Sequence, residues 1–564
     1  MGIKHYFFSG IRSLKNNGIR VTLQKVQQVI VQKNALKQLK NSYFISEEIR
    51  VKQSKEIFNT SIVFSIVVPL YNTPMNYLIE MIKSVQEQTY EKWELCLADG
   101  SIAVYQKGIE EYCRKIAQKD KRIKYKKLEK NQGISENTNA ALEMAKGDYI
   151  GLLDHDDLLH PSALYEVMCV IEKENADFIY TDEATFERTV KNLVTVHFKP
   201  EYGLDTLRAN NYICHFSVFR KVLLEKIGNF RKEYDGSQDH DMVLRLTKEA
   251  KKICHIPKLL YFWRAHDSSV AKNVTAKSYA VDAGIRAVQS SIETYGEKVK
   301  VESSKECPTI YRLHYTLKEE PFVSIIILCK GKEEYTKQCI QSILEKSSYK
   351  KYEIIVVDTF RFTVKKAKGK YLILLHNTTK VISPFWIEEM MMYAQRDDIG
   401  VVGAKLYYPD NTIQHAGIFV GMKTEDKIGY PHRYQKKENL GYMGRLCYAQ
   451  NVSTVTVACM MIRKTLYEQL GGFNETFAMK YYDVDFCIRV RQAGYAIIFT
   501  PYAELYYYQG KVRNLEYKEQ KQYQKEMDIF KEYWKEELKR GDPYYNPNFN
   551  QEEANFMLRN YNNK

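Results

Sequence analysis

Three familiar sequence patterns are missing, and each absence narrows the class of protein. The eleven cysteines form no Cys-x-x-Cys pair and no Cys/His zinc spacing, which predicts reduced, buried thiols in a cytosolic protein. No apolar run approaches the ~18 residues that a membrane-spanning helix needs. The start, MGIKHYFFSG, lacks the long apolar core and cleavage site of a signal peptide. We therefore expect a cytoplasmic protein that is soluble, or at most peripheral to a membrane.

Length and charge set the next bounds. With 564 residues the chain is too long for one compact core, so two or more domains are expected. Its 84 lysines and arginines exceed its 69 aspartates and glutamates, which gives a net charge of +15. Such an excess favours anionic partners, such as nucleotide phosphates, nucleic acid or an acidic membrane face. Nucleic acid is disfavoured, because no recognisable binding motif or aromatic-basic repeat accompanies the charge.

Residues 1–60 form a basic N-terminal segment. Its first 40 positions hold no acid and eight basic residues, namely Lys4, Arg12, Lys15, Arg20, Lys25, Lys33, Lys37 and Lys40. Ile19, Leu23, Val26 and Ile30 recur at helical spacing, which predicts an amphipathic helix. The helix either lies on an anionic membrane surface or docks on the body of the protein with its charges in water. The second interpretation is favoured, because solvated basic faces are common.

Residues 61–300 alternate between short apolar runs and helical patterns. The run SIVFSIVVPLYN ends in a turn, and further strands are predicted at WELCLAD, RIKYKK and DYIGLLD, with helices between them. This alternation predicts an open α/β sheet, in which ligands bind beyond the carboxyl ends of the strands. Asp99 and the cluster Asp154–Asp157 both fall at such ends.

A second copy of the pattern occupies residues 322–514. Among the segments that recur in order are FSIVVPLYN as VSIIILCKG, AKGDYIGLLDHDD as AKGKYLILLHNTT, LEKIGNF as YEQLGGF, and GSQDHDMVLRL as KYYDVDFCIRV. Such ordered matches predict a duplicated domain. Residues 301–321, which include PTIYRLHYTLKEEP, are the expected linker. Residues 515–564 are the expected tail, helical to Arg540 until GDPYYNPNFN breaks the pattern.

The first copy carries three carboxylates in four positions, Asp154, Asp156 and Asp157, directly behind an apolar strand. Two such charges about 4 Å apart repel by ~4 kcal/mol at the dielectric of a protein surface, so a pocket that holds several favours a cation or a proton. Oxygen ligands suit Mg²⁺ or Mn²⁺, which commonly join one or two carboxylates to a substrate's phosphates. The alternative is an acidic turn in which Asp156 or Asp157 caps the helix after Pro161.

A second acidic pair, Asp239 and Asp241, lies where another helix is predicted to begin. Several side chains in this stretch could cap that helix, and a carboxylate here could act as a general base if it faces a substrate hydroxyl. Downstream, Arg264 and His266 add a cation and a titratable donor that could hold phosphate. A lone histidine such as His266 is more often structural.

Taken together and in order, SIVVPLYN, LADGS, LLDHDD, GSQDHD and YFWRAH resemble the nucleotide-sugar glycosyltransferases of family 2. The resemblance covers residues 61 to about 275 closely and the second copy more weakly. It implies an α/β fold of two tandem GT-A domains, which are Rossmann-like nucleotide-diphospho-sugar transferase domains. The entry GIRSLKNNGIRVTLQK and the tail GDPYYNPNFN are similar to those of two-domain members from bacterial surface-polysaccharide loci.

The resemblance assigns a donor site. In this family the turn after the first strand flanks the nucleotide, which implies that Pro69 and Tyr71 contact the base and ribose. The aspartate of the DGS turn, here Asp99, binds the base. The D-x-D motif falls on Asp154 and Asp156, which are the implied ligands of Mn²⁺ or Mg²⁺ and hence of the sugar diphosphate.

The resemblance also assigns the groups that act on the acceptor and the leaving group. The family's general base is the aspartate before the second acidic helix, which falls on Asp239. The usual Glu-Asp reads Gln238-Asp239 here, so Asp241 remains the alternative base. Arg264 and His266 match the loop that closes on the leaving diphosphate.

The implied reaction is an inverting, metal-dependent transfer. A divalent cation neutralises charge on the leaving diphosphate, one carboxylate takes the acceptor's proton, and a single displacement inverts the anomeric centre. Processive synthases of the family add transmembrane helices and a Gln-x-x-Arg-Trp motif, so their absence predicts addition of one or a few sugars. The implied donor is a UDP- or dTDP-sugar, with dTDP-rhamnose the first to try. The implied acceptor is a glycan, lipid-linked at the cytoplasmic membrane face.

The second copy has lost the acids of the D-x-D motif, whose places hold His376 and Thr378. Only 18 positions separate its Asp358 from His376, where 55 separate Asp99 from Asp154. About one strand-helix segment is therefore missing where much of the nucleotide site should lie. One histidine without acids is a poor Mg²⁺ or Mn²⁺ site.

Asp483 and Asp485 remain in the second copy and are expected to support a helix rather than to catalyse. We expect this domain to bind the acceptor, to dimerise or to buttress the first domain. Two other classes remain as alternatives. A nucleotidyltransferase would need a glycine-rich phosphate loop, which VVPLYNTPMN does not provide. A non-catalytic carbohydrate-binding assembly partner would need both sites to be inactive, which the complete acid set of the first copy argues against.

Overall fold

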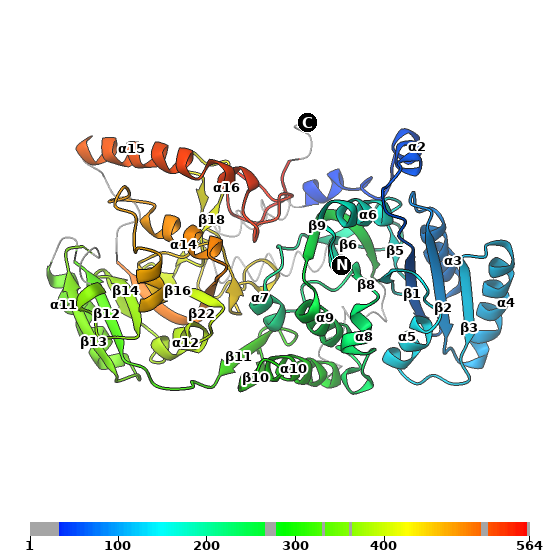
Figure 1. Ribbon diagram of the computed structural model, residues 1–564, viewed down its shortest axis with the longest axis horizontal. Coiled ribbons are helices and arrows are strands. Elements are labelled where there is room, and N and C mark those ends of the chain that lie inside the picture. Colours follow the sequence, from blue (N-terminus) through cyan, green and yellow to red (C-terminus); the bar gives the residue numbers. More distant parts are fainter. Residues whose placement is uncertain (1–32, 266–277, 330–332, 360–363, 509–516, 561–564) are drawn as a thin grey trace, which may run out of the picture.

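The computed structural model describes residues 33–265, 278–329, 333–359, 364–508 and 517–560. Within them the chain forms two α/β domains that lie side by side (Figure 1), each built on one large sheet. This confirms the predicted fold class. The predicted basic helix through Ile19–Ile30 and the residue His266 lie outside the described residues.

The first sheet has nine strands in the order β3-β2-β1-β4-β8-β6-β9-β5, with β7 paired to β6. Strands β3, β2, β1 and β4 are parallel, and β8 runs antiparallel to both β4 and β6. The chain order reverses at β1 and β4, which is where open α/β sheets bind their ligands. The strands are β1 Phe64–Leu70, β2 Trp93–Asp99, β3 Ile123–Lys127, β4 Tyr149–Leu152, β5 Leu158–Leu159, β6 Phe178–Phe186, β7 Leu193–His197, β8 Ser217–Arg220 and β9 Ile253–Arg264.

Strand β1 is almost wholly apolar because helices cover both faces of the sheet. Ile66 and Val68 pack in one core with residues of α3, while Val67 packs in the other core with Ala141 of α5. All of them are fully buried, which is why the strand lacks an alternating pattern. The helices of this half are α2 Glu47–Lys55, α3 Met75–Gln86, α4 Ala103–Lys119, α5 Ile134–Leu142, α6 Ala163–Glu174, α7 Leu204–Ala209, α8 Leu223–Ile227, α9 Gln238–Glu249 and α10 Ser278–Glu293.

The second sheet repeats the first without one edge. Its order, β13-β12-β14-β21-β16-β22-β15, matches β2-β1-β4-β8-β6-β9-β5 strand for strand. In the described part of this domain nothing corresponds to β3, and the turn η4 (Val364–Lys366) stands where α4 and α5 would be. The loss of a strand-helix segment, predicted from the spacing, is confirmed. The strands are β12 Val323–Leu328, β13 Tyr352–Val357, β14 Tyr371–His376, β15 Thr379–Val381, β16 Ile399–Tyr407, β21 Cys459–Arg463 and β22 Ala496–Tyr507.

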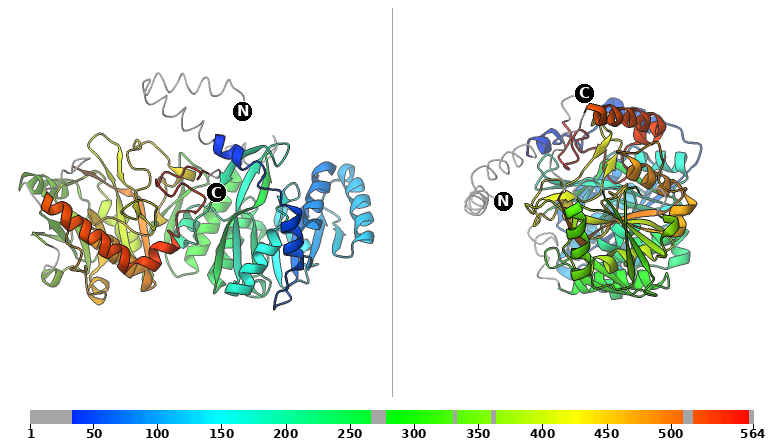
Figure 2. Two further views of the ribbon diagram at one scale, coloured as in Figure 1. Left: turned by 90° about the horizontal axis from the view of Figure 1, so that it is seen from above. Right: turned by 90° about the vertical axis from the view of Figure 1, so that its left-hand side faces the viewer.

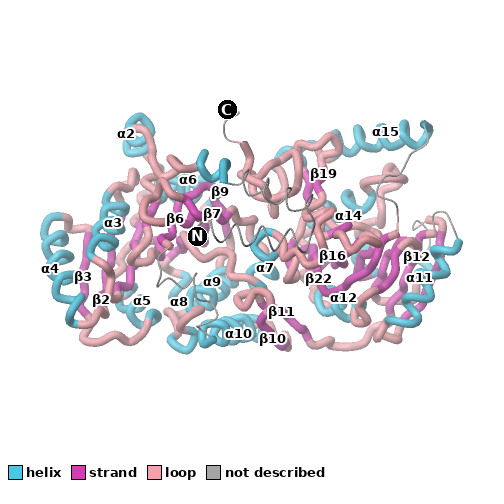
Figure 3. Tube along the Cα trace, turned by 180° about the vertical axis from the view of Figure 1, so that it is seen from behind, coloured by secondary structure: helices cyan, strands magenta, loops and turns pink. Residues whose placement is uncertain are grey.

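Smaller elements surround this sheet. The short strands are β17 Ile413–His415, β18 Phe419–Val420, β19 Ile428–Gly429 and β20 Gln450–Asn451. The helices are α11 Glu333–Lys346, α12 Trp386–Ala394, α13 Lys464–Gln469, α14 Tyr482–Gln492, α15 Tyr517–Tyr533 and α16 Lys535–Arg540. Figure 3 shows the two sheets from behind, with α7 lying between them.

The segment predicted as a linker is an ordered hairpin. Strands β10 (Val299–Ser303) and β11 (Tyr311–Tyr315) pair antiparallel, and the side chains of Tyr311, Leu313 and Tyr315 are buried. They belong to a hydrophobic core that contains residues of both domains. The connection is therefore part of the interface and not a free tether.

Polar contacts lock the same interface. The guanidinium of Arg396 forms a buried ion pair with Asp205 of α7. The side-chain oxygen of Asn451 accepts hydrogen bonds from the backbone N–H groups of Asp205 (3.0 Å) and Thr206 (3.1 Å). A Cβ on Gly203 would lie 2.6 Å from that oxygen, so only glycine allows this close approach. All these groups are buried, so the interface combines apolar packing with satisfied polar contacts.

The C-terminal residues return to the first domain. Helices α15 and α16 pack on the second domain, where the indole N–H of Trp534 donates to Asp485 (3.1 Å). The chain then crosses toward the first domain (Figure 2), where the carbonyl of Pro543 accepts from the N–H of Glu201 at 2.7 Å. Ala35 and Leu39 of the N-terminal segment join the same hydrophobic cluster as this tail. Within the described residues no helix is both long enough and apolar enough to cross a bilayer.

Candidate active site

The acidic cluster follows β4, at the point where the strand order reverses. The side chain of Asp154 is 46% exposed, whereas Asp157 is fully buried. Asp154 and Asp156 are therefore placed near solvent at the carboxyl edge of the sheet, as the sequence predicts for ligands of a cation.

Asp157 holds the turn together. Its two carboxylate oxygens accept hydrogen bonds from the hydroxyl of Tyr261 (2.6 Å) and the backbone N–H of Arg264 (2.7 Å). Burial, together with the charges of Asp156 and Asp154, raises its pKa well above the ordinary value. The helix-capping alternative is wrong, because α6 begins after Ser162 with no side-chain cap.

Asp154 pairs with a histidine that no motif predicted. Its Oδ2 lies 3.5 Å from Nε2 of His215, whose Nδ1 lies 3.4 Å from Oε2 of Glu183. The imidazole stacks on the ring of Tyr261, with 4.7 Å between centroids. Burial alone would lower the pKa of His215, but the two carboxylates raise it well above its ordinary value. Burial would likewise raise the pKa of Asp154, and the hydrogen bond and charge of His215 bring it below the ordinary value. The ring of His215 thus lies between two carboxylates on the inner side of the motif.

Arg264, predicted to contact the leaving diphosphate, contacts groups of the protein itself in this structure. Its guanidinium donates to the backbone carbonyl of Asp156 (2.7 Å) and to the carboxylate of Glu80 (2.7 Å), and lies over the ring of Tyr77 at 4.4 Å. The side chain is buried. In this conformation Arg264 fixes the acidic turn, and its contact with diphosphate stays a prediction.

The predicted nucleotide residues gather on the neighbouring strands. Leu70 pairs with Asp99 in the parallel ladder, so Pro69, Tyr71 and Asp99 lie at one edge of the sheet. Asp99 is fully buried and accepts from the hydroxyl of Tyr125 (2.8 Å) and the N–H of Ser101 (2.9 Å). Tyr71 is 43% exposed. The ring of Tyr71 is open to a ligand, whereas the oxygens of Asp99 already accept hydrogen bonds from the protein.

The two candidate bases differ sharply. Asp241 is buried against the guanidinium groups of Arg231 and Arg245 and supports the structure in this conformation, and its role as an alternative base stays a prediction. Asp239 is only partly buried and accepts one hydrogen bond from the amide of Asn211 (3.0 Å). Of the two carboxylates, Asp239 is the more accessible, as a general base would need to be.

One short segment joins Asp239 to the acidic turn. Residues 211–215 place Asn211 against Asp239 and His215 against Asp154. The pKa of the Cys214 thiol is well above its ordinary value, first because the thiol is buried. The negative charges of Glu183, Asp239 and Asp154 raise it further. The predicted base and the predicted metal ligand therefore flank the same five residues.

The residues present fit a cation site in which the phosphates of a substrate supply the remaining ligands. No group of three or more His, Cys, Asp or Glu side chains gathers as a metal centre in the part of the chain that the structure describes. Asp154 and Asp156 would supply two carboxylates, and Mg²⁺ or Mn²⁺ is commonly held by one or two carboxylates together with substrate phosphates. The partly exposed carboxylate of Asp154 leaves room for such a third partner.

The corresponding place in the second domain holds no acid. His376 lies 3.4 Å from the hydroxyl of Tyr507 and 3.5 Å from that of Tyr482. Asp483 accepts the N–H of Val457 (3.2 Å), and Asp485 accepts from Arg489 and Trp534. Both retained aspartates thus support the protein's own structure.

Comparison with known proteins agrees with this duplication. Residues 65–228 match the family model described as glycosyl transferase family 2, and residues 357–528 match that described as glycosyltransferase like family 2. The chain is 37% identical over 538 residues to an uncharacterized protein y4gI of Sinorhizobium fredii, covering 88% of this chain and 58% of that protein. It is 29% identical over 519 residues to the O-antigen biosynthesis protein RfbC of Myxococcus xanthus, covering 86% of this chain and 40% of that protein. The chain thus spans about half the length of these two relatives.

Among solved structures, TarS 1–349 of S. aureus is 20% identical, with a TM-score of 0.33 over 41% of this chain and 65% of that one. The two family matches fall on the two α/β domains described above. The chain belongs to glycosyl transferase family 2, with one family domain in each half.

Proposed function

We propose that the first domain transfers a sugar from a nucleotide-diphospho-sugar to a glycan acceptor, and that the second domain does not catalyse. The observation that carries this proposal is the placement of Asp154 and Asp239 on either side of segment 211–215, at the carboxyl edge of the first sheet. A donor diphosphate and an acceptor hydroxyl need these two kinds of carboxylate in one place.

The proposed mechanism assigns each side chain one task. A divalent cation held by Asp154 and Asp156 would neutralise the charge that develops on the leaving diphosphate. His215 holds the Asp154 carboxylate, and Asp157 fixes the turn that carries both metal ligands. Asp239 takes the proton of the attacking hydroxyl. One displacement with one base inverts the anomeric centre.

The second domain has the features of a binding module. A cavity of about 750 Å³ opens at the end of β13, and its lining holds three carboxylates (Asp358, Glu468 and Glu475), one lysine (Lys365) and the rings of Tyr467, Phe473 and Tyr482. Carboxylates repel a diphosphate, whereas they accept hydrogen bonds from sugar hydroxyls beside aromatic rings. These features support a role in holding an uncharged part of the acceptor glycan.

The wider role follows from relatives and charge. The Myxococcus xanthus relative is an O-antigen biosynthesis protein, which supports a place in bacterial cell-surface polysaccharide synthesis. The proposed donor is a UDP- or dTDP-sugar, and the proposed acceptor is lipid-linked. The eight basic residues of the first 40 would then favour peripheral contact with an anionic membrane.

Donor hydrolysis by the purified chain tests the proposal. Nucleoside diphosphate release is measured with Mn²⁺ and a panel of nucleotide sugars, for wild type, Asp156→Ala and the matched second-domain variant Asp483→Ala. We expect loss in Asp156→Ala alone. Loss only in Asp483→Ala would overturn the assignment of domains. If no donor turns over, even with a panel of glycan acceptors, the chain is a non-catalytic assembly partner.

A further inference from the structure

The last described residues, 541–560, form a strap that runs from the second domain onto the first. The amide of Asn548 donates to the carbonyl of Pro257 (2.8 Å), and Phe549 packs edge-on against Phe198 with 5.6 Å between centroids. Figure 1 places this strap at the top of the molecule, between the two domains. It is the path by which the second domain reaches behind the proposed donor site.

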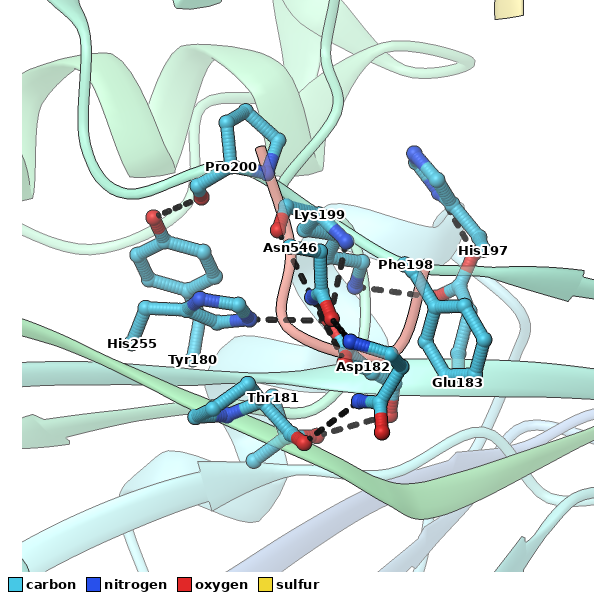
Figure 4. A network of polar contacts seen from close by, with 12 residues as sticks. Tyr180, Thr181, Asp182, Glu183, His197, Phe198, Lys199, Pro200, His255 and Asn546 are labelled. Atoms are coloured by element: carbon cyan, nitrogen blue, oxygen red, sulfur yellow. Dashed lines mark hydrogen bonds and ion pairs between the residues drawn. The ribbon is translucent and has the colours of Figure 1, made fainter. Parts of the chain in front are cut away.

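One strap side chain enters a buried polar network of the first domain. Asn546 is 3% exposed, and its Nδ2 lies within hydrogen-bond distance of both carboxylate oxygens of Asp182 (2.9 and 3.2 Å) and of the carbonyl of Lys199 (2.9 Å). Figure 4 shows the amide inserted between these groups. Asp182 also accepts from the N–H of Lys199 (2.9 Å) and lies 2.8 Å from Nε2 of His255. Of the three residues that hold this carboxylate, Asn546 is the one supplied from outside the first domain.

The network continues from Asp182 to the acidic turn. The ammonium of Lys199 pairs with Glu183 at 3.2 Å and donates to the carbonyls of Ile213 (2.6 Å) and His215. Glu183 in turn lies 3.4 Å from His215, which lies 3.5 Å from Asp154. Lys199 therefore fixes both the backbone of the 211–215 segment and the carboxylate behind His215. Every link is buried or partly buried, so water does not readily replace a contact that is lost.

We propose that Asn546 is a positioning residue of the donor site, through which the strap makes metal binding in the first domain depend on the C-terminal end of the chain. The amide holds Asp182 and the backbone of Lys199, and Lys199 sets the places of Glu183 and His215 behind Asp154. This inference rests on the proposed function, because it assumes that Asp154 binds a metal. Groups that orient metal ligands from behind commonly contribute 10- to 100-fold to metal affinity or activity.

The strap offers its own control. Asn548 has the same side chain, lies two residues away and also bonds the first domain, but its bond to Pro257 leads away from the network. Asn546→Ala removes the hydrogen bonds to Asp182 and Lys199 and the acceptor of the Asn548 N–H, whereas Asn548→Ala removes one bond to the carbonyl of Pro257. A purely adhesive strap therefore predicts a larger loss of stability for Asn546→Ala but the same Mn²⁺ affinity in both folded variants. A positioning role predicts different Mn²⁺ affinities.

The experiment uses the full chain and two readouts. Mn²⁺ affinity is measured with UDP present, from the electron paramagnetic resonance signal of free Mn²⁺ corrected for the Mn²⁺ that UDP alone binds, and donor hydrolysis from nucleoside diphosphate release. We expect Asn546→Ala to weaken Mn²⁺ binding about 10-fold or more and to lower kcat, while Asn548→Ala stays within twofold of wild type. Equal values for the two variants would overturn the inference. If Asn546→Ala does not fold, Asn546→Ser, which keeps a hydroxyl at the site, supplies the same comparison.

The failure of this inference is distinguishable from failure of the proposed function. Wild-type protein that neither binds Mn²⁺ nor hydrolyses a donor refutes the metal site itself, and the inference with it. Wild-type protein that does both, with Asn546→Ala unchanged, refutes only the strap's role.

Discussion

Nε2 of His215 lies 3.5 Å from Oδ2 of Asp154, which places an imidazole directly behind the first residue of the acidic motif. The contact joins the end of β4 to the segment before β8, and Glu183 holds the other ring nitrogen. The predicted metal ligand Asp154 is therefore oriented by His215, from the segment before β8, and through it by Glu183 of β6.

Replacement of His215 by alanine should impair the donor site. The variant loses the group that fixes the Asp154 carboxylate, and we expect a 10- to 100-fold loss of Mn²⁺ affinity or of donor hydrolysis. His197→Ala is the matched control, because Nδ1 of His197 also lies 3.4 Å from Glu183 but its ring does not contact Asp154. Equal effects in the two variants would contradict the positioning role of His215.

Removal of Asp157 should destabilise the first domain. Asp157→Ala leaves the buried hydroxyl of Tyr261 and the N–H of Arg264 without their acceptor, and each orphaned group costs about 1–3 kcal/mol. Tyr261→Phe keeps the Arg264 bond and removes the hydroxyl together with its longer contact to the N–H of Asp154 (3.3 Å), and it should cost less. Thermal unfolding of the full chain measures the order. A smaller effect for Asp157→Ala than for Tyr261→Phe would show that the turn does not depend on this carboxylate.

Removal of one partner of the buried ion pair at the domain interface should lower the free energy of unfolding. Arg396→Met leaves the Asp205 carboxylate buried without its guanidinium, which should cost about 3–5 kcal/mol. The double variant Arg396→Met, Asp205→Leu removes both charges and should recover much of the loss. Urea unfolding of each variant gives the comparison. A double variant less stable than the single one would mean that the charges themselves specify the packing.

The pair of His255 and Asp182 should make stability depend on pH. Burial lowers the pKa of His255, but the carboxylates of Asp182 and Glu201 raise it to about 9. Because the folded-state pKa is above the ordinary value of 6.5, the stabilisation is fully present below about pH 6.5 and is lost as pH rises through about 9.

His255→Gln tests this pH dependence directly. The difference in thermal midpoint between wild type and the variant should be largest near pH 6 and shrink toward pH 9.5. His314→Gln is a suitable control, since that imidazole pairs at 3.2 Å with Glu302, whose side chain is 44% exposed, whereas Asp182 is fully buried. A difference for His255→Gln that does not change with pH would refute the charged pair.

Local pattern and spacing predicted much of the scaffold. The apolar run through Ile66 and Val68 is a buried strand because helices cover both of its faces. The acids at Asp154 follow β4 because ligand-binding groups gather at strand ends. The missing edge of the second sheet was predicted because only 18 positions separate Asp358 from His376, whereas 55 separate Asp99 from Asp154 in the first copy.

The hairpin that replaced the predicted linker had a readable signal. Tyr311, Leu313 and Tyr315 alternate with polar residues, which is the pattern of a half-buried strand. Their burial depends on residues of both domains, however, so the alternation alone could not say where they would pack.

The partners of the acidic turn could not be predicted. His215 and Glu183 carry no motif, and Asn546 meets Asp182 across 364 positions of sequence. Contacts of this kind depend on how complete elements pack, and neither periodicity nor residue spacing contains that information. The protonation of His215 likewise follows only from its position between two carboxylates.

One hydrophobic core contains Val288, Tyr315 and Tyr393, and it therefore joins the first domain, the hairpin and the second domain. The repeat in the sequence marks two similar units, but the connection between them packs on both. Tyr311 lies against Gly284 and His240 of the first unit, whereas Tyr315 packs edge-on against Tyr393 of the second. A fragment that ends between the repeats would therefore expose Tyr315. The boundary of the repeat and the boundary of independent folding therefore do not coincide.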